Sequence, residues 1–599
     1  MSVPSDLESS SLPDYSIVHP VPGVGRPLDY VPKPDDPLYI GEQLPTALLP
    51  AVSVNQYGAE HEKKAFLPIT TVREFVMLQF MNSVTDKPDW VFNPEIIEKW
   101  RSETVGAPDL DMTTRMFDYC IAELQHIATH VFPQRQDLAL VVYNGNVVKS
   151  DSAIASSVKV ALQDAVKRLE NVHEKNKDWH PDSDEMVLDL VHPSLFPLIY
   201  GRTRVLKIAE KVVGLEDLVS RCGEGEALVA DATNAPAANV RKQWGHGIEP
   251  YSLKYQWLPC EVDISGSEAR ITSYINNLHP KEHADLYRVI EQVIVAAIPL
   301  WELTLAPLYD KDYRYYKRIP CDTVEYGPLP AGLTNQGWNS PPRPVIQPEP
   351  GSFDAQNIAN TPRAIDFKEI YGKQGRPLQI IVKLANIELT PEKWKYEGGS
   401  WHVEGQQNEH ICATALYYYS SDNIKSSQLA FRQFVDSDSV YYGYPYQQDQ
   451  HQFLEELFGC QNGMAGVQDV GKVETREGRL LTFPNILQHQ VQPFELEDPM
   501  RNGHRKILAL FLVDPNVRVA STAYVPSQRL DWWQEAAVDA LEQLPFELKE
   551  KVFGEVDGFP ITLSEAKEIR LDLMKERGQF VTEYHYEVKR VNSFSLCEH

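Results

Sequence analysis

The sequence predicts an α+β protein in which an antiparallel β-barrel or sandwich is wrapped by a mostly helical N-terminal region and closed by C-terminal helices. The first observation is the helical periodicity of apolar residues along much of residues 65–364. The second is a series of short β-type runs between residues 365 and 525, with turn residues between them. The third is the return of helical periodicity over residues 526–599.

Residues 1–64 form a proline-rich N-terminal arm. They include the stretch "HPVPGVGRPLDYVPKPDDP" and show little periodicity of either kind. Proline fixes the backbone and lacks an N–H donor, so a segment this rich in it does not form a regular helix or sheet. We expect an extended arm that is draped on the body of the protein or is partly disordered.

Four segments of residues 65–364 carry the apolar spacing of amphipathic helices, and a further long helix is predicted to open near Pro280. Asn144 and Gly145 join two β-branched runs, which predicts a β-hairpin near residues 140–150. Residues 325–364 are rich in proline and glycine and predict a linker or surface wrap. The four helical segments are "VREFVMLQFMNSV", "PEIIEKWRSE", "TTRMFDYCIAELQHIATHVF" and "SSVKVALQDAVKRLENVHEK".

Residues 365–525 change in texture to β-branched and aromatic runs bounded by turn residues, which is typical of an antiparallel sandwich or barrel. Residues 526–599 then predict helices in "WWQEAAVDALEQL" and "SEAKEIRLDLMKERGQF". The predicted strands lie in "RPLQIIVKLANIEL", "GSWHVEGQ", "HICATALYYYSS", "SQLAFRQFV", "GKVETREGRLLTFPN", "LQHQVQPFEL" and "HRKILALFLVDP".

Composition excludes several classes of partner and location. Lys and Arg number 57 against 84 Asp and Glu, a net charge of −27, so the surface repels phosphate backbones and nucleic acid is not expected as a partner. The seven cysteines are scattered without a C-x-x-C pair, as in a cytoplasmic or nuclear protein with reduced thiols. We expect a protein that is neither secreted nor in a membrane, because the sequence shows no signal peptide and no apolar run of about 20 residues.

The segment "GGSWHVEGQ" places His402 and Glu404 two residues apart. On a strand, side chains at this spacing point to the same face, so an imidazole and a carboxylate would project together. A second histidine from a distant strand would complete a set of two histidines and one carboxylate, the usual ligands of non-haem Fe(II). His489, in "LQHQVQPFEL", lies 85 residues after Glu404 and is the histidine that we expect to complete the metal site.

Arg505 opens the strongly β-prone run "HRKILALFLVDP" and is predicted to share a face with Ile507 and Ala509. An arginine that points into a small barrel needs an anionic partner, because a buried unpaired charge is very costly. Its planar guanidinium suits a carboxylate bound through two parallel hydrogen bonds.

The H-x-E pair, the distant histidine and the following arginine resemble the Fe(II)/2-oxoglutarate-dependent oxygenases, which have a double-stranded β-helix (jelly-roll) core. Longer stretches resemble the largely fungal domain-of-unknown-function family 4246 over roughly residues 65–599. These stretches are "DWHPDSDEMVLDLVHPSLFPLIYGRTRVL", "SYINNLHPKEH", "GGSWHVEGQQNEHICATALYYY" and "SFSLCEH".

The oxygenase resemblance implies roles for four residues: His402, Glu404 and His489 would hold Fe(II), and Arg505 would bind 2-oxoglutarate. It implies that O₂ and 2-oxoglutarate are consumed, that succinate and CO₂ are released, and that a small-molecule substrate is hydroxylated, desaturated or cyclised. Two positions depart from the common pattern. Glu404 stands where aspartate is commoner, and Ile507 stands where a serine often contacts 2-oxoglutarate.

Tyr417, Tyr418 and Tyr419 follow on a predicted central strand, where alternation lets one or two of them face the site. Core packing is the preferred role for each tyrosine, and Tyr417 and Tyr419, which would share a face, are the candidates for 2-oxoglutarate or substrate binding. His410 is expected to be packed or hydrogen-bonded rather than to bind metal, and His504 to lie on the face opposite Arg505.

Two polar segments of the N-terminal region admit structural explanations. Asn276 and Asn277 are expected to cap the long helix that follows them, with a substrate wall as the alternative. His180, Asp182 and Asp184 suggest a second metal site, but a solvated turn is the preferred interpretation.

Two other functional classes fit the same residues. One is a catalytically silent barrel that serves as a binding or scaffold protein, and the other is a cupin-like metalloenzyme that does not use 2-oxoglutarate. The convergence of His402, Glu404 and His489 would favour a metal enzyme over a scaffold. An Arg505 without a protein carboxylate partner would favour 2-oxoglutarate over the cupin-like alternative.

Overall fold

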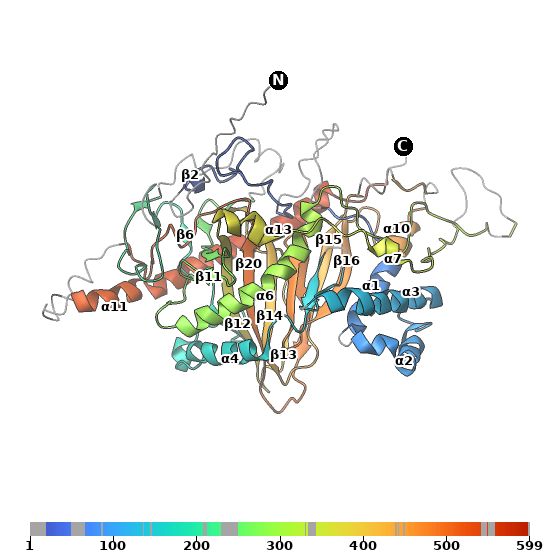
Figure 1. The fold of residues 1–599 in the computed structure, drawn as a ribbon, viewed down its shortest axis with the longest axis horizontal. Coiled ribbons are helices and arrows are strands. Elements are labelled where there is room, and N and C mark those ends of the chain that lie inside the picture. The colour runs from blue at the N-terminus through green and yellow to red at the C-terminus, as the bar shows by residue number, and fades with distance from the viewer. Residues whose placement is uncertain are drawn as a thin grey trace, which may run out of the picture.

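The computed structural model gives the arrangement of the chain in Figure 1. The residues that it describes are 19–48, 66–85, 88–135, 137–143, 146–207, 212–228, 250–329, 331–332, 343–437, 440, 443–446, 450–540, 545, 548 and 558–596.

A nine-stranded antiparallel sheet, here called the large sheet, is the centre of the fold. Its strands run in the order β11-β10-β12-β20-β14-β17-β4-β3, and β5 pairs with β12 beside this path. The longest strands, β12, β14 and β20, are rich in β-branched, leucine and aromatic residues, which suit a sheet buried on both faces. The strands are β3 (Leu140–Val141), β4 (Val148–Ser150), β5 (Val187–Val191), β10 (Cys260–Asp263), β11 (Arg270–Ile271), β12 (Leu378–Leu389), β14 (Ile411–Asp422), β17 (Leu480–Pro484) and β20 (Gly503–Val513).

A smaller antiparallel sheet, here called the small sheet, packs on one face of the large one. It contains β16 (Val467–Glu474), β15 (Gln428–Phe434) and β18 (Gln488–Val491) in that order. A separate two-stranded pair joins β13 (Lys395–Tyr396) to β19 (Phe494–Glu495), which follows β18 closely in the chain. Side chains of both sheets form one buried cluster, here called the inter-sheet core, which includes Leu429, Phe431, Val470, Val473, Leu416, Tyr418, Ala509 and Phe511.

Two helices, α4 (Ser156–Glu170) and α6 (Ala284–Tyr309), cover the other face of the large sheet (Figure 1). By length and hydropathy α6 could cross a membrane, yet more than half of its most apolar window is buried inside the protein. Its residues Val289, Ile290, Val293 and Ile294 pack in the core under the sheet. A helix that is apolar on most of its surface is also what a large protein core requires, so this burial accounts for its composition.

Three N-terminal helices and two C-terminal ones complete the regular framework. Helix α1 (Val72–Val84), α2 (Pro94–Thr104) and α3 (Thr114–His126) lie beside the small sheet (Figure 1), each beginning at a threonine or asparagine whose side chain caps the first turn. The C-terminal helices are α11 (Leu530–Ala540) and α13 (Leu563–Val591). The remaining short elements are β1 (Val21–Pro22), β2 (Gly25–Arg26), β6 (Leu198–Ile199), β7 (Arg204–Val205), β8 (Glu226–Ala227), β9 (Tyr255–Gln256), α7 (Ala355–Ile358), α8 (Phe367–Ile370) and α10 (Gln452–Phe458).

Helix α13 crosses from the large sheet to the small one. Its Arg570 pairs with Asp178, which precedes β5, and its His585 bonds to Gln488 of β18 at 2.8 Å. Along the helix, buried side chains recur at spacings of three, four or seven residues, as on one helix face. They are Arg570, Leu573, Phe580, Tyr584 and Val588.

The α+β class and most predicted elements are confirmed. The predicted hairpin exists as the antiparallel pair β3–β4, while its turn residues Asn144 and Gly145 lie outside the described residues. Of the predicted arm, residues 1–18 and 49–64 also lie outside them. The part that is described buries Leu28, Leu44, Ala47 and Leu48 against the body.

Three expectations differ from the structure. The N-terminal region, predicted to be mostly helical with one β-hairpin, also supplies β5, β10 and β11 to the large sheet. The segment "GSWHVEGQ" is not a strand, since His402 makes only an isolated bridge. Asn276 and Asn277 do not cap α6, and their side-chain amides donate instead to backbone carbonyls of residues 192–196.

Candidate metal centre

His402 and His489 are brought together by their own backbones. His402 lies in the loop between β13 and β14, and His489 lies on β18. Each N–H donates to the other residue's carbonyl, at 3.2 Å from His402 and 2.9 Å from His489. Residues that exchange both hydrogen bonds are direct cross-strand neighbours, so their side chains project side by side. The two imidazole rings lie 4.3 Å apart.

Glu404 supplies the third polar group. Its Oε1 lies 3.2 Å from Nε2 of His489 and 3.8 Å from Nε2 of His402, and the potential ligand atoms of all three residues lie within 4.8 Å of one another. The Nδ1 of His402 lies 2.8 Å from the carbonyl of Ser400, which can only accept, so Nδ1 carries the proton. This tautomer leaves the Nε2 lone pair free toward Glu404, as in a histidine that binds a metal.

The backbone of Glu404 is fixed by Asn485. The side chain of Asn485 accepts from the N–H of Glu404 at 2.9 Å and donates to its carbonyl at 3.0 Å. The next residue, Gly405, has φ +70°, and a Cβ there would lie 2.9 Å from the Ile411 side chain. Glycine therefore fits this turn where other residues would be strained. These contacts hold Glu404 in place although it is not on a strand.

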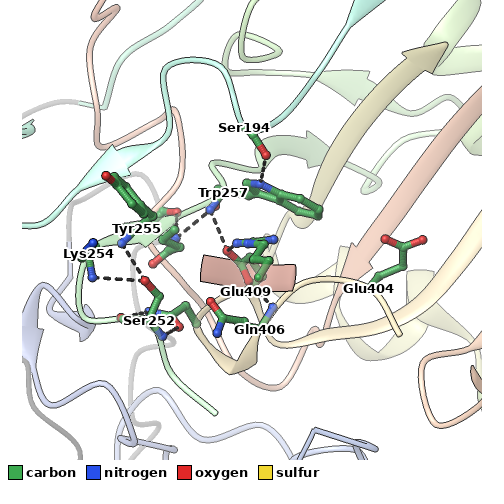
Figure 2. Close-up of polar contacts among 12 residues, drawn as sticks. Ser194, Ser252, Lys254, Tyr255, Trp257, Glu404, Gln406 and Glu409 are labelled. Carbon is green, nitrogen blue, oxygen red and sulfur yellow. Dashed lines mark hydrogen bonds and ion pairs between the residues drawn. The ribbon is translucent and has the colours of Figure 1, made fainter. Parts of the chain in front are cut away.

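The loop continues into a second polar network, which Figure 2 shows beside Glu404. Glu409 accepts from the N–H of Gln406 and from the N–H of Trp257, both at 2.7 Å. Arg577 of α13 donates to Glu409 at 2.5 Å and lies over the Trp257 ring. The carboxylate of Glu404 points away from this network (Figure 2), so the network anchors the loop and leaves Glu404 free to act as a ligand.

The three groups shift one another's pKa values. Burial alone would raise the pKa of Glu404, but hydrogen bonds and charges from His402 and His489 hold it well below its usual range. Burial opposes a charge on His402, yet Glu404 outweighs it and raises the pKa of His402. Burial lowers the pKa of His489, and the neighbouring charge of His402 lowers it further. The cluster thus keeps an anionic carboxylate beside two imidazoles.

Arg505 is only 2% exposed and projects between the two sheets. Its Nη1 donates to the hydroxyls of Ser427 at 3.3 Å and Thr475 at 3.2 Å, and the guanidinium lies over the rings of Phe494 and Tyr418. Its Nε is buried without a hydrogen-bond partner, and no described carboxylate pairs with it. Burial without an anion lowers the pKa of Arg505.

Three other buried arginines in the described part of the chain each donate to an acid at 2.6 to 2.7 Å. Hydroxyls and aromatic faces do not cancel a full charge, so the environment of Arg505 differs in kind from theirs. The paired arginines are Arg479 with Asp151, Arg518 with Glu261 and Arg570 with Asp178.

The tyrosine assignment is corrected by the strand's orientation. Tyr417 and Tyr419 lie on the face of β14 that packs on α4 and α6, away from the inter-sheet core. Tyr418 faces the inter-sheet core, with the Arg505 guanidinium 5.6 Å from its ring centroid. Tyr418 is therefore the tyrosine that lies beside Arg505, and the choice of Tyr417 and Tyr419 had the wrong parity.

The other histidines near the motif lie outside the cluster. His410 is buried, and its Nδ1 lies 2.9 Å from the amide nitrogen of Gln43 and 3.2 Å from that of Gln407. His504 bonds to Ser420 at 2.8 Å. Both placements agree with the structural roles expected for them.

A second group of possible ligands was not found from the sequence. His180 does not join Asp182 or Asp184, which are both exposed, but lies 2.8 Å from Asp189 of β5, with His192 nearby. Burial would raise the pKa of Asp189, but the surrounding positive groups, His192 first, lower it to about 2. The missing signal was the strand β5, which the sequence analysis did not predict.

Two family models match this chain. The model described as "Protein of unknown function (DUF4246)" matches residues 114–536, and "Domain of unknown function DUF4246, N-terminal" matches residues 21–103. No curated protein matches the chain.

Similar solved structures include an Fe(II)/(alpha)ketoglutarate-dependent dioxygenase, TqaL, at 14% identity and TM-score 0.15, over 24% of this chain and 46% of that one. A bsmA homolog from Methylobium petroleophilum PM1 has 13% identity and TM-score 0.16, covering 32% and 63%. IDO from Bacillus thuringiensis has 12% identity and TM-score 0.15, covering 30% and 71%. The match thus spans less than half the length of TqaL, and at these scores the likenesses carry no argument about function.

Proposed function

This chain belongs to the DUF4246 family, and from the geometry of its polar cluster we propose that it is a non-haem Fe(II), 2-oxoglutarate-dependent oxygenase. The proposed reaction is hydroxylation of a small molecule by O₂, with conversion of 2-oxoglutarate to succinate and CO₂. His402, Glu404 and His489 would hold the iron, and Arg505 would bind the distal carboxylate of 2-oxoglutarate.

The proposed fold of this core is a double-stranded β-helix. The strand order supports it: β12, β20, β14 and β17 are neighbours in the large sheet, and β18, β15 and β16 in the small one. From β14 the chain passes to the small sheet for β15 and β16, returns to the large sheet for β17, passes to the small sheet again for β18 and ends in the large sheet at β20, as in a jelly roll. This arrangement puts the β13–β14 loop and β18 together at one end of the inter-sheet core, where the three ligands meet.

The donor set fits ferrous iron. Two neutral imidazole nitrogens and one carboxylate oxygen on one side of a metal leave the remaining positions open, which is the arrangement of non-haem iron oxygenases. Asn485 and the carbonyl of Ser400 orient Glu404 and His402 in the way that outer hydrogen bonds orient metal ligands. Iron bound there together with 2-oxoglutarate supplies the oxidising chemistry, and the protein residues hold both in place and exclude water.

The unpaired guanidinium of Arg505 carries the co-substrate assignment. A buried cation without an anion is costly, and a dicarboxylate ligand would supply the missing charge. The hydroxyls of Ser427 and Thr475 accept hydrogen bonds only from Nη1 of Arg505. Its Nε and Nη2 therefore have no hydrogen-bond partner among the described residues. A carboxylate could accept from both of these nitrogens, the two-point contact that guanidinium makes best. The unpaired guanidinium also disfavours the cupin-like alternative, because an enzyme that does not bind 2-oxoglutarate would leave this cation without an anion.

Anaerobic titration of the Fe(II)-loaded protein with 2-oxoglutarate tests the proposal. Chelation of ferrous iron by 2-oxoglutarate should produce a weak visible absorption band that saturates with ligand. Arg505→Gln should still bind iron but need about 30-fold more 2-oxoglutarate, the equivalent of losing a charge-assisted pair. His402→Ala should lose the band together with the iron.

Other outcomes would select the alternatives. Iron binding without a band at any 2-oxoglutarate concentration would favour the cupin-like metalloenzyme. The absence of iron binding in folded wild-type protein would leave a binding or scaffold role. An unchanged 2-oxoglutarate affinity in Arg505→Gln would remove the assigned role of that residue even if the enzyme class held.

A further inference from the structure

Lys383 lies on the same face of the large sheet as Arg505. In the register of β12 with β20, Lys383 is opposite Ala509, and Ile387 is opposite Arg505. Cross-strand partners, and residues two or four apart on one strand, point to the same face. Ala509 belongs to the inter-sheet core, so the side chain of Lys383 also projects toward the space between the sheets. The Cα atoms of Lys383 and Ile387 are about 13 Å apart along the strand.

The neighbours of Lys383 leave it room. Across the strand is Ala509, and two residues along β12 is Ala385, both with the smallest side chain that still has a Cβ. Lys383 itself is half-buried. Its ammonium makes no hydrogen bond or ion pair within the described part of the chain. A half-buried lysine of β20, Lys506 on the opposite face of the large sheet, is by contrast paired with Glu170 at 2.8 Å.

Asp189, an acid of the neighbouring strand β5, forms no ion pair with Lys383. Asp189 of β5 is paired in register with Ala385, so its side chain lies on the same face, beside Lys383. Its Oδ2 is already engaged by His180 at 2.8 Å and lies 3.5 Å from Nη1 of Arg570. Its Oδ1 is buried without a hydrogen-bond partner. This face of the large sheet therefore presents the unpaired ammonium of Lys383 beside the unused acceptor Oδ1 of Asp189.

Lys383 faces the same space as one of the candidate metal ligands. In the register of β18 with β15, His489 is opposite Phe431, which belongs to the inter-sheet core, so the side chain of His489 also projects between the sheets. His402 is about one-third exposed, so the cluster also has a route from solvent on its side. A ligand held by Lys383 would thus lie between the sheets near the metal ligands.

We propose that Lys383 is the substrate anchor of this site and binds a carboxylate, so that the substrate is a small carboxylic acid. The inference rests on the oxygenase function proposed above. Arg505 and Lys383 then bind different ligands. The fully buried guanidinium binds the dicarboxylate co-substrate, and the half-buried ammonium binds the substrate that enters from solvent. A charge-assisted contact of this kind orients the substrate without contributing to the oxidation.

The test uses acetate, the smallest carboxylate probe, and its neutral isostere acetamide. The protein is loaded with Mn(II) and saturating 2-oxoglutarate, and the paramagnetic relaxation of the probe's methyl protons is measured by NMR. Acetate should show saturable relaxation, while acetamide at equal concentration should show about tenfold less, as expected for loss of a charged contact. Lys383→Gln should reduce the acetate effect to the acetamide level, and Lys383→Arg should keep most of it.

The controls separate this inference from the proposed function. Lys506→Gln removes one positive charge from the opposite face of the same sheet and should leave the acetate effect unchanged. Equal relaxation by both probes, no relaxation by either, or an acetate effect that persists in Lys383→Gln would overturn the assignment of Lys383. Acetate bound directly to the metal would give that last result. A failure of 2-oxoglutarate to bind at all would instead reject the enzyme class, and a loss of 2-oxoglutarate affinity in Lys383→Gln would assign Lys383 to the co-substrate.

Discussion

Two clusters in this protein contain the same chemical groups, two histidines and one carboxylate, yet they differ in what surrounds them. Glu404 meets only His402 and His489, and its backbone is held by neutral groups. Asp189 has Arg570 within 3.5 Å as well as its two histidines. A carboxylate that already faces a guanidinium gains little from a metal ion, because the cation would be repelled.

The tautomers of His402 and His192 also favour metal binding at the first cluster and disfavour it at the second. His402 uses Nδ1 to donate to a backbone carbonyl and keeps Nε2 free toward Glu404. His192 uses Nδ1 to accept from the N–H of Ser194, so its neutral form carries the proton on Nε2. A protonated nitrogen is no ligand. The comparison teaches that ligand type and spacing do not define a metal site until the neighbouring charges and hydrogen bonds are known.

The largest expected effect is on metal affinity. Glu404→Ala should weaken Fe(II) or Mn(II) binding by at least about 100-fold, because it removes one of three metal ligands. Loss of a residue that only orients a ligand costs up to about 100-fold, and loss of the ligand itself should cost at least as much. Asp189→Asn should leave the affinity and the stoichiometry of one metal per chain unchanged. Electron paramagnetic resonance of added Mn(II) measures both. A second equivalent of tightly bound metal that disappears in Asp189→Asn would contradict this distinction.

A comparable effect is expected on stability, where the second cluster should be the more sensitive one. Arg570→Met breaks buried ion pairs with Asp178 and Asp189 and should lower the free energy of unfolding by roughly 3 kcal/mol. Lys383→Gln should change it by less than about 1 kcal/mol, because this lysine has no ion pair to lose. Urea denaturation of the metal-free proteins gives both values. A large loss in Lys383→Gln would mean that Lys383 has a structural partner.

The candidate site was predicted from the sequence for a reason that was only partly right. The three proposed ligands do lie together, but not because His402 and Glu404 share a strand. The bridge between His402 and His489 and the contacts of Asn485 bring them together, and such long-range contacts leave no local pattern. Arg505 was placed on the right face because its strand is long and regular, so that alternation holds along it.

The failures come from short elements and from strand parity. Alternation shows that Tyr417 and Tyr419 share a face but not which face is inward, since all three tyrosines are equally apolar. Strand β5 has only five residues, with Asp189 in the middle, and it follows the polar turn that contains Asp182 and Asp184, so the sequence analysis assigned it no strand. Its place in the large sheet depends on pairing with β12, about 200 residues away. Such a pairing cannot be predicted from the periodicity of neighbouring residues.

The last expected effect is a pH dependence of the free energy of unfolding that comes from Asp189 of the second cluster. The pKa of Asp189 is lowered to about 2 in the folded protein, whereas an unfolded aspartate titrates near 3.8. A carboxyl whose pKa is depressed by folding stabilises the protein above the unfolded value and loses that contribution as the pH falls through the folded one. Wild-type protein should therefore exceed Asp189→Asn by about 2 kcal/mol near pH 6, and this gap should narrow between about pH 4 and pH 2. Urea denaturation of the two proteins over this range measures the gap. A gap that stays constant would mean that Asp189 stabilises the fold through uncharged contacts, and the contrast with Glu404 would then rest on geometry rather than on charge.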